Sequence, residues 1–399
     1  MANLINAKTS GVGGLETTAD NTGNINIQSG GSTVMEVTSA GVAVTGSLTQ
    51  NGEAYSTQPT FRNRIINGNM TIDQRNAGAS VTNVSANSYT TDRFYNFGHA
   101  NSKFTSQQVT DAPESFNYSL KNTSLSAYSV GASEAFLIAQ IIEGFNAADL
   151  AWGTAYAKTV TLSFWVRSSL TGTFGGSLRN SAGNRSYPYS YTISSADTWE
   201  KKSITVPGET TGTWLTTNGS GIRLTFSLGT GSTYSGTAGS WAATNYLSVT
   251  GATSVVGTSG ATLYITGVQL EAGTTATDFE NLQYGQQMQL CQRYFYSLGG
   301  TASYEFMTHG MYVGTTTPLL RAELPVKMRA APTLGSTGTF LAKSGNSNLA
   351  CASFSVDQAA TQTFSFSATI SGGSSTVGYA TLMFANASTA TRLTFSAEL

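Results

Sequence analysis

The segment VTLSFWVRSS, residues 160–169, decides the fold, because its residues sort into two faces at the two-residue period of a β-strand. These faces carry Leu162, Phe164 and Val166 on one side and Ser163, Trp165 and Arg167 on the other. A strand with an apolar face must bury that face against a second layer. The segment therefore predicts one strand of a two-layer β-structure.

Similar segments recur along the chain between turns rich in Gly, Ser, Thr and Asn. They span residues 187–193, 198–208, 222–229 and 261–273. Many such strands with almost no helical periodicity predict an antiparallel β-sandwich of jelly-roll type over residues 61–280. The apolar run EAFLIAQIIEGFNAADL, 134–150, fits either a buried strand or a short helix, and we favour the strand because a jelly roll carries one here.

Residues 1–60 form a separate segment with three very short predicted strands, near Ile25–Ile27, Val34–Val37 and Val42–Val44. Each strand is too short to bury a core alone, so copies of the same chain are the expected partners. The alternative is a tail that orders only on docking. In either case residues 1–60 are predicted to be a unit distinct from the sandwich.

Residues 281–300 change to a helical period and are predicted to link the sandwich to a third, C-terminal β-domain at 301–399. One apolar stripe at steps of four, three, four and three consists of Tyr284, Met288, Cys291, Phe295 and Leu298. Such a stripe predicts a helix face or a short coiled-coil seam that would hold a trimer together. In the C-terminal domain, which we expect to be a β-sandwich tip, alternation predicts that Leu382, Phe384, Leu393 and Phe395 face inward.

The composition excludes several classes of function. Charged residues make up 10% of the chain and the net charge is −1, so no electrostatic footprint for nucleic acid exists. No apolar run approaches the roughly 20 residues that span a bilayer. The first residues, MANLINAKTSG, lack the basic start and apolar core of a signal peptide, and we expect none. Two cysteines 60 positions apart form no disulfide framework, and Cys291 is expected to be a buried free thiol.

Three carboxylates, Glu271, Asp278 and Glu280, lie close together in YITGVQLEAGTTATDFE, 264–280. A glycosidase needs a pair of carboxyl groups at a fixed separation. We favour a structural role, in which the carboxylates bind backbone amides or a neighbouring arginine. A structural Ca²⁺ held by oxygen ligands such as Asp92 and Asp278 is left open, because no dedicated loop is visible. No nucleophile, zinc or phosphate-loop motif occurs, so we expect no catalysis, no cofactor and no assigned metal site.

Sugar binding is the positive hypothesis from the residues. Aromatic rings stack on the apolar faces of sugars, while amides and charged groups bind the hydroxyls. The candidate glycan contacts are Tyr187, Tyr189, Tyr191, Trp214 and Trp241 in the central domain and Tyr304 and Tyr312 in the tip. The alternative for the tyrosine stripe is packing against its own second sheet or a neighbouring subunit.

Several phrases in a fixed order resemble bacteriophage tail fibre and virion appendage proteins. They are NRIINGNMTIDQRN (63–76), SYTTDRFYNF (88–97), TLSFWVRSS (161–169), ITGVQLEAGTTATDFE (265–280), LCQRYFY (290–296) and LPVKMRAAPT (324–333). The resemblance implies a homotrimer in the virion, whose N-terminal segment joins phage tail proteins. It also implies a jelly roll similar to carbohydrate-binding modules and a distal tip, which together recognise a host surface glycan or outer-membrane receptor.

Two other functions remain open on the sequence. A depolymerising tailspike would cleave host polysaccharide, but it predicts a long β-helix with stacked repeats, and no such period is present beyond the N-terminal hairpins. A non-receptor adaptor or baseplate decoration would use the same sandwich only as a spacer. The host, the receptor and the tail protein that anchors the chain cannot be read from the sequence.

Overall fold

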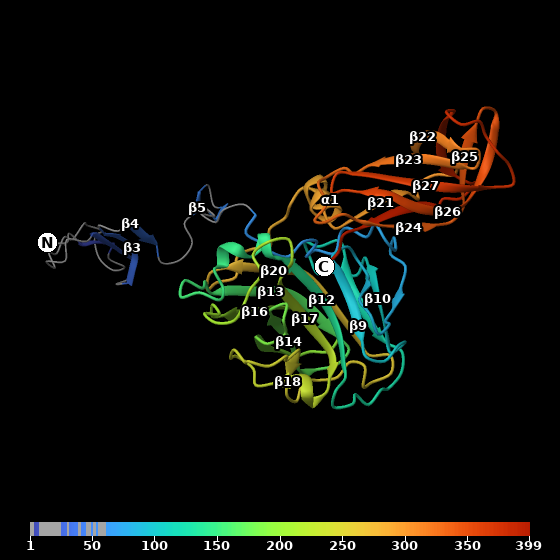
Figure 1. Ribbon diagram of the computed structural model, residues 1–399. Coiled ribbons are helices and arrows are strands. Elements are labelled where there is room, and N and C mark those ends of the chain that lie inside the picture. The colour runs from blue at the N-terminus through green and yellow to red at the C-terminus, as the bar shows by residue number, and fades with distance from the viewer. Residues whose placement is uncertain are drawn as a thin grey trace. The chain divides into compact units, whose positions relative to one another are not determined.

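The fold was analysed in a computed structural model, which describes residues 4–7, 25–29, 32–38, 41–44, 49–50, 53–54 and 61–399. The chain divides into two compact units, Met1–Thr60 and Phe61–Leu399 (Figure 1). Each unit is considered by itself. No helix in the described ranges is both long and apolar enough to cross a membrane.

The first unit contains a four-stranded sheet in the order β1-β2-β3-β4. Its strands are β1 (Leu4–Ala7), β2 (Ile25–Ser29), β3 (Ser32–Thr38) and β4 (Gly41–Val44), and β5 (Thr49–Gln50) pairs with β6 (Glu53–Ala54). β1 runs parallel to β2, and the other pairs are antiparallel. The three short strands predicted between residues 25 and 44 are confirmed. Ile25 and Val44 leave apolar side chains exposed.

The second unit begins with two six-stranded antiparallel sheets, which confirms the predicted antiparallel β-sandwich. The first sheet has the order β16-β13-β20-β11-β10-β7 and the second the order β15-β14-β17-β12-β9-β8. The first comprises β7 (Val81–Thr82), β10 (Phe104–Val109), β11 (Ser119–Ser124), β13 (Val160–Ser168), β16 (Glu200–Val206) and β20 (Thr262–Ala272). The second comprises β8 (Ser88–Tyr89), β9 (Phe94–Gly98), β12 (Ala135–Glu143), β14 (Gly172–Arg179), β15 (Ser186–Ile193) and β17 (Ser220–Thr230).

The core lies between these sheets and follows the predicted alternation. Leu162, Phe164 and Val166 of β13 are fully buried in it. The ambiguous run at 134–150 is a strand, as predicted, followed by the 3₁₀ turns η1 (Gly144–Asn146) and η2 (Ala148–Leu150). All nine residues of β12 are buried, because side chains pack on both of its faces, which explains why the run is apolar without alternation.

Smaller elements complete the outer face of the second sheet. They are η3 (Ser232–Tyr234) and the short parallel pair β18 (Ser235–Gly236) and β19 (Ser248–Val249). Leu247 and Tyr234 from this segment pack against Leu137 of β12.

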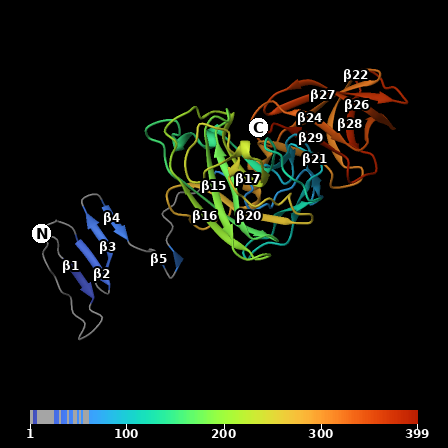
Figure 2. The same ribbon diagram turned by 90° about the horizontal axis from the view of Figure 1, so that it is seen from below.

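The C-terminal domain is a β-structure, as predicted, but its main sheet closes into a barrel rather than forming an open sandwich. The barrel order is β22-β23-β27-β26-β25-β28, and it closes because β28 pairs with both β22 and β25. Its strands are β22 (Phe306–Gly314), β23 (Thr317–Glu323), β25 (Phe340–Ser344), β26 (Ser347–Ala359), β27 (Thr363–Ser371) and β28 (Ala380–Ala385). Figure 2 shows these strands gathered at the C-terminal end of the chain.

The helical linker is shorter than predicted. Helix α1 spans Tyr284–Gln292, and the chain then enters β21 (Phe295–Gly299), which pairs with β29 (Arg392–Ser396), itself paired with β24 (Thr333–Thr337). The prediction of a helical linker over residues 281–300 is therefore wrong in its extent. The run YFY at 294–296 has strong β-propensity, and pairing with β29 adds the backbone hydrogen bonds that a longer helix would have supplied.

The predicted trimer seam does not form one stripe. Tyr284 is 62% exposed, whereas Cys291 is fully buried in a small core with Ile66, Ile72 and Tyr294 of the same chain, and Met288 packs against that core. The remaining two members, Phe295 and Leu298, lie on β21 and not on the helix. Cys291 is a buried free thiol, as predicted, and burial raises its pKa well above the ordinary value.

A buried cluster of charges joins the barrel to the sandwich. Arg93, 1% exposed, forms an ion pair with Glu398 and lies over the Tyr294 ring, with 3.6 Å between its guanidinium carbon and the ring centroid. Arg75 donates to the second oxygen of the Glu398 carboxylate at 2.8 Å. The backbone carbonyl of Glu398 accepts a hydrogen bond of 2.8 Å from Arg329. One carboxylate next to the C-terminus thus binds two arginines of the sandwich, and we call this cluster the joint.

A second ion pair reinforces the joint from the sandwich side. Arg293 donates two hydrogen bonds, of 2.8 and 2.6 Å, to the carboxylate of Glu143 at the end of β12. The Tyr294 hydroxyl donates to the same carboxylate at 2.6 Å. Burial opposes ionisation of Glu143, but these hydrogen bonds outweigh it and lower the pKa of the carboxyl group. The phrases at 63–76, 88–97, 290–296 and 324–333 therefore meet at the joint.

Asp92 gives this region a testable pH dependence. Its carboxylate is buried and accepts hydrogen bonds from Gln74, and burial raises its pKa from 3.8 to about 6 despite the nearby Arg75. A raised folded-state pKa contributes stability below about pH 4, which is lost as the pH rises through about 6. The shift corresponds to about 3 kcal/mol. Relative to Asp92→Asn, the native protein should lose about that much unfolding free energy between pH 4 and pH 7 in urea titrations. A pH-independent difference would contradict this assignment.

Candidate functional site

Two of the three carboxylates in the 264–280 segment, Glu271 and Glu280, are bound within the chain. Glu271, 1% exposed, accepts hydrogen bonds from the amide and hydroxyl of Thr277, at 2.9 and 2.7 Å, and its carboxylate lies 3.6 Å from Arg62. Glu280 accepts from the backbone amides of Phe61 and Asn63. These two carboxylates hold residues 61–63 against the end of β20, which agrees with the structural role that we favoured. The described ranges contain no group of three His, Cys, Asp or Glu side chains that could hold a metal ion.

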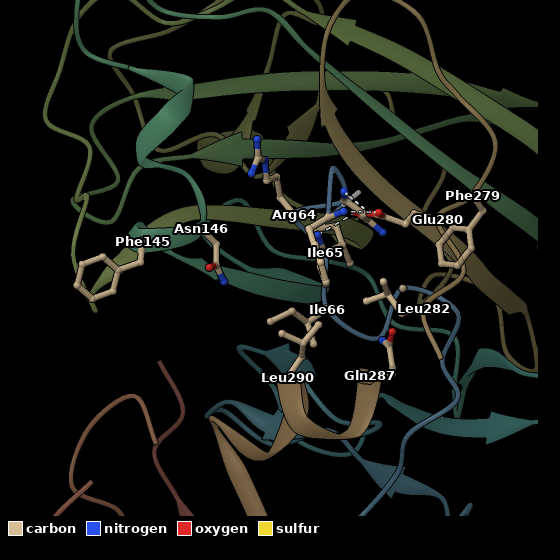
Figure 3. Close-up of a pocket in the computed structure, with 13 residues that line it drawn as sticks. Arg64, Ile65, Ile66, Phe145, Asn146, Phe279, Glu280, Leu282, Gln287 and Leu290 are labelled. Carbon is tan, nitrogen blue, oxygen red and sulfur yellow. Dashed lines mark hydrogen bonds between the residues drawn. The ribbon is translucent and has the colours of Figure 1, made fainter. Parts of the chain in front are cut away.

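A cavity of about 240 Å³ lies beside Glu280. Figure 3 shows its lining, in which Ile66, Leu282 and Leu290 supply apolar side chains and Gln287 lies next to them on α1. The cavity sits between the 61–68 segment, η1 and the helix. Its lining also includes the polar residues Asn63, Arg64 and Asn146, and Glu280 binds the backbone amides of the 61–63 segment beside it, so we regard the cavity as part of the support for the linker.

The tyrosine stripe of β15 belongs to the core. Tyr187, Tyr189 and Tyr191 are 5%, 1% and 6% exposed. Tyr191 packs edge-on against Phe164 of the facing sheet, with 5.0 Å between the ring centroids, and the Tyr189 hydroxyl donates to the Thr225 carbonyl at 2.7 Å. The prediction that these rings stack on a sugar is corrected, because no sugar can reach them. The alternative, packing against the second sheet, holds.

Two predicted tryptophan contacts form an aromatic cluster with Trp152. Trp214, 9% exposed, and Trp241 approach the Trp152 ring edge-on, with centroid separations of 4.8 and 5.3 Å. Trp241 also donates from its indole nitrogen to the Pro207 carbonyl at 2.9 Å and packs on Tyr187. Trp214 is therefore corrected to a core residue, while Trp241 keeps a partly exposed ring at the edge of the cluster.

The two candidate glycan contacts in the C-terminal domain, Tyr304 and Tyr312, differ in their exposure. Tyr312 is fully buried inside the barrel, which corrects its assignment as a glycan contact, whereas Tyr304 is 59% exposed before β22. The outer wall of the barrel carries exposed apolar side chains instead, among them Phe306, Met311 and Leu382. A shallow cavity of about 430 Å³ lies in this wall beside Met311. The surface of its lining is mainly apolar, and its polar side chains are those of His309, Arg321 and Ser365, so it offers few groups that could orient a sugar.

The strongest site for a polar ligand lies on the outer face of the first sheet, around Trp165. A cavity of about 280 Å³ is lined by the half-buried ring of Trp165 together with Phe116, Lys201, Glu114, Asp278 and Asn281. Trp165 and Lys201 are direct cross-strand partners of β13 and β16. Three aromatic rings, those of Trp165, Phe116 and Phe279, thus adjoin an ammonium group, two carboxylates and an amide within one hollow. We call this cavity the Trp165 pocket.

A bulge in β20 shapes the Trp165 pocket. The register between β13 and β20 shifts between Ser163 and Trp165, opposite Gly267, whose φ is 60°. A Cβ atom on Gly267 would lie 2.7 Å from the Phe116 ring and 3.1 Å from the Trp165 ring. Only glycine allows both rings to approach the backbone so closely in this conformation. The bulge therefore sets the position of the two rings, as bulges beside binding sites often do.

Beside the Trp165 pocket, the outer face of the first sheet carries a second group of aromatic and charged side chains. Arg167 lies over Tyr264, with 4.1 Å from the guanidinium carbon to the ring centroid, and also contacts the face of Trp199 at 5.3 Å. Arg167 forms an ion pair with Asp111. Burial lowers the pKa of Arg167, but the interactions with Asp111 and Tyr264 together outweigh burial and raise the pKa. The rings of Tyr264 and Trp199 and the guanidinium of Arg167 therefore lie beside the Trp165 pocket on the same face of the sheet.

One feature of the sequence, the outward-facing Trp165, could have predicted this site. Trp165 was placed on the face of its strand opposite the core, and a large aromatic ring on a face directed away from the core needs a separate explanation. The other pocket residues come from the 114–116 loop and the 278–281 segment, and only the fold brings these to β13.

Comparisons with known proteins give fold-level similarities only. No protein-family model and no curated protein matches the chain. Among solved structures, a family 11 carbohydrate-binding module of a Clostridium thermocellum cellulosomal cellulase is 11% identical, with 48% of this chain and 98% of that chain covered and a TM-score of 0.26. The N-terminal cellulose-binding domain of Cellulomonas fimi β-1,4-glucanase C is 16% identical, covering 42% and 87%, with a TM-score of 0.20.

A phage protein is also among the similar structures. The enzymatically active domain of tailspike protein 4 of bacteriophage CBA120 is 13% identical, with 53% of this chain aligned and a TM-score of 0.28. The aligned part spans only 22% of that chain. These scores are too low to support a functional argument, so the candidate site rests on its own geometry.

Proposed function

We propose that this protein is a bacteriophage tail fibre that binds a host cell-surface glycan, and that the Trp165 pocket is a binding site for that glycan. The observation that carries the proposal is the half-buried Trp165 ring in a hollow with Lys201, Asp278 and Asn281. A sugar ring presents an apolar C–H face to an indole, while its hydroxyls accept from the ammonium and amide and donate to the carboxylate. The ordered phrases shared with tail fibre proteins support the virion context.

In this proposal the protein binds and does not cleave. Glu271 and Glu280 are engaged by Thr277 and by the 61–63 backbone, so neither is available to a substrate. Glu114 and Asp278 remain in the Trp165 pocket, where they can accept hydrogen bonds from sugar hydroxyls. A tailspike depolymerase would use such carboxylates to break a glycosidic bond.

A direct test titrates a panel of cell-surface oligosaccharides into the intact protein and follows tryptophan fluorescence. A sugar that stacks on Trp165 changes the environment of a half-buried indole, so a saturable change is expected for at least one class of glycan. Release of reducing sugar, measured in the same samples, should stay at the background rate. Absence of any saturable response would remove the proposed function, and steady release of reducing sugar would establish the depolymerase instead.

The proposed assembly is a trimer in the phage tail. Residues 1–60 join a tail protein, the sandwich and barrel face the host, and the chain acts at the host cell surface. Three copies would multiply weak glycan contacts, because a second and third site bind at high effective concentration once the first is engaged. An adaptor without receptor binding would share this architecture but would show no glycan response.

The exposed apolar wall of the barrel is proposed as a trimer contact. Met311 and Leu382 are 50% and 44% exposed on adjacent strands, and exposed patches of this kind mark association surfaces. Replacing both with glutamate should reduce the mass of the assembly, measured by light scattering, from three chains toward one. Val356→Glu is the matched control, because Val356 is 48% exposed on β26, which lies three strands from β22 and two strands from β28 around the barrel. A native protein with the mass of one chain would contradict the trimer.

A further inference from the structure

Two arginines lie side by side on the outer face of the second sheet, away from the Trp165 pocket. Arg179 of β14 and Arg223 of β17 are direct cross-strand partners. Their strand neighbours Leu178 and Leu224 are fully buried in the core, so both arginines point outward. Like charges placed directly opposite each other on neighbouring strands repel. The pair therefore needs a compensating partner.

The described part of the chain provides no carboxylate partner for this pair. Seven other arginines form ion pairs with carboxylates, namely Arg62, Arg64, Arg75, Arg93, Arg167, Arg185 and Arg293. Within residues 61–399, no Asp, Glu or terminal carboxylate lies within 4.0 Å of Arg179 or Arg223. Within residues 61–399, Arg179 donates only to the Asn245 side-chain oxygen, at 2.6 Å, and Arg223 only to the Ser220 hydroxyl, at 3.2 Å.

Arg179 also keeps a donor without an acceptor. Its Nε atom is buried and has no hydrogen-bond partner in the structure. Burial, together with the charge of Arg223, lowers the pKa of Arg179 to about 10. Burial and the neighbouring charge both disfavour the protonated guanidinium, because positive charge is concentrated in a poorly solvated place without a counter-charge. An unsatisfied buried guanidinium donor of this kind is a group that a bound anion would satisfy.

The surroundings complete an anion cradle. Tyr95 on β9 and Tyr234 of η3 both lie within electrostatic range of Arg179. Tyr95 packs beside Ala139 and Ile141, so an apolar floor adjoins the two guanidinium groups. Both arginines are partly exposed, which leaves a route from solvent. Guanidinium groups bind carboxylate, sulfate and phosphate through paired hydrogen bonds.

We infer that Arg179 and Arg223 together bind an acidic group, a carboxylate, sulfate or phosphate ester, of the surface glycan, at a subsite separate from the Trp165 pocket. The inference rests on the proposed function and narrows its ligand to the acidic class of polysaccharides. Neutral parts of such a polysaccharide suit the rings around Trp165, and acidic units suit the arginine pair.

The test measures binding of three probes by calorimetry at low and moderate salt: trigalacturonate, a sulfated galactose disaccharide and neutral galactotriose. The intact native protein should bind at least one acidic probe about tenfold more tightly than galactotriose, as charge-assisted hydrogen bonds predict. Arg223→Gln should abolish that preference. Arg321→Gln, at an exposed barrel arginine with no carboxylate partner in residues 61–399, is the matched control and should leave the preference intact.

The thermal midpoint without ligand provides a second readout. Arg223→Gln should raise it, because the substitution relieves repulsion at the pair, whereas an arginine needed for folding would lower it. A lower midpoint, or equal affinity for acidic and neutral probes, would overturn the inference. If a neutral probe then binds in a way that depends on Trp165, the proposed function stands without the arginine subsite. If neither the three probes nor the wider oligosaccharide panel gives a response, both the subsite and the proposed function are contradicted.

Discussion

Replacing Glu398 with alanine is expected to lower the free energy of unfolding by about 3–5 kcal/mol, a large part of the stability of most domains. The carboxylate of Glu398 is 6% exposed and compensates both Arg93 and Arg75. Its removal leaves two cations in the joint without their shared partner, and unpaired buried charge is the main source of such losses. Urea denaturation gives the change in free energy, and calorimetry is expected to split one transition into two as the barrel and the sandwich uncouple.

A second variant separates the loss of the ion pair from the loss of packing. The double change Arg93→Met with Glu398→Leu removes the pair and keeps apolar volume, so it should be more stable than Glu398→Ala. Glu323→Ala, at an exposed glutamate of β23 with no ion pair in residues 61–399, is the matched control and should stay within about 0.5 kcal/mol of the native protein. A Glu398→Ala variant as stable as that control would show that the joint is not held by charge.

Trp165→Ala should weaken glycan binding by about 30-fold, which corresponds to about 2 kcal/mol. The indole is the largest apolar surface of the Trp165 pocket, and truncation removes the stacking face while leaving Lys201, Glu114 and Asp278 in place. Fold stability should change little, because the ring lies outside the core between the sheets. Isothermal calorimetry with the tightest oligosaccharide of the panel gives the affinity, and thermal unfolding checks the fold.

Tyr156→Ala is the control for this measurement, because Tyr156 is 84% exposed and does not line the Trp165 pocket. It removes an aromatic ring of similar size from the same domain and should leave the affinity unchanged. Equal losses from both substitutions would indicate nonspecific adsorption to aromatic surface. Native affinity in Trp165→Ala would place the glycan elsewhere.

The sandwich was predictable because its strands carry one apolar face each. In β13 only one of the two faces could be the core, and Leu162, Phe164 and Val166 are buried as expected. In the stretch ATLMFA of β28, by contrast, the two-residue period does not identify which face points inward. Apolar residues occupy both faces, so the two-residue period cannot select one, and Leu382 is 44% exposed while Met383 and Ala385 fill the barrel. Our expectation that Leu382 and Phe384 face inward is therefore wrong, whereas Leu393 and Phe395 are buried as predicted.

The site was harder to predict than the fold because it depends on long-range geometry. The tyrosine stripe of β15 looked suited to a sugar, yet alternation alone does not tell which face of a sheet is covered. The joint was also invisible, since Arg75, Arg93 and Glu398 are isolated charges in the sequence and meet only through tertiary contacts. The Glu271 carboxylate was interpretable because one of its partners, Thr277, lies close in sequence, whereas Glu280 binds the amides of Phe61 and Asn63, which only the fold brings to it.

In the tail fibre that we propose, the joint has a mechanical consequence. Tension arriving at the barrel passes into the sandwich through the short helix α1, the Glu398 carboxylate with Arg93 and Arg75, and the Arg293–Glu143 bridge. These connections act in parallel and are short and stiff, so a pull is shared rather than concentrated on one peptide segment. Under load the barrel and the sandwich are therefore expected to move as one rigid body. Deformation is then expected in other parts of the proposed fibre.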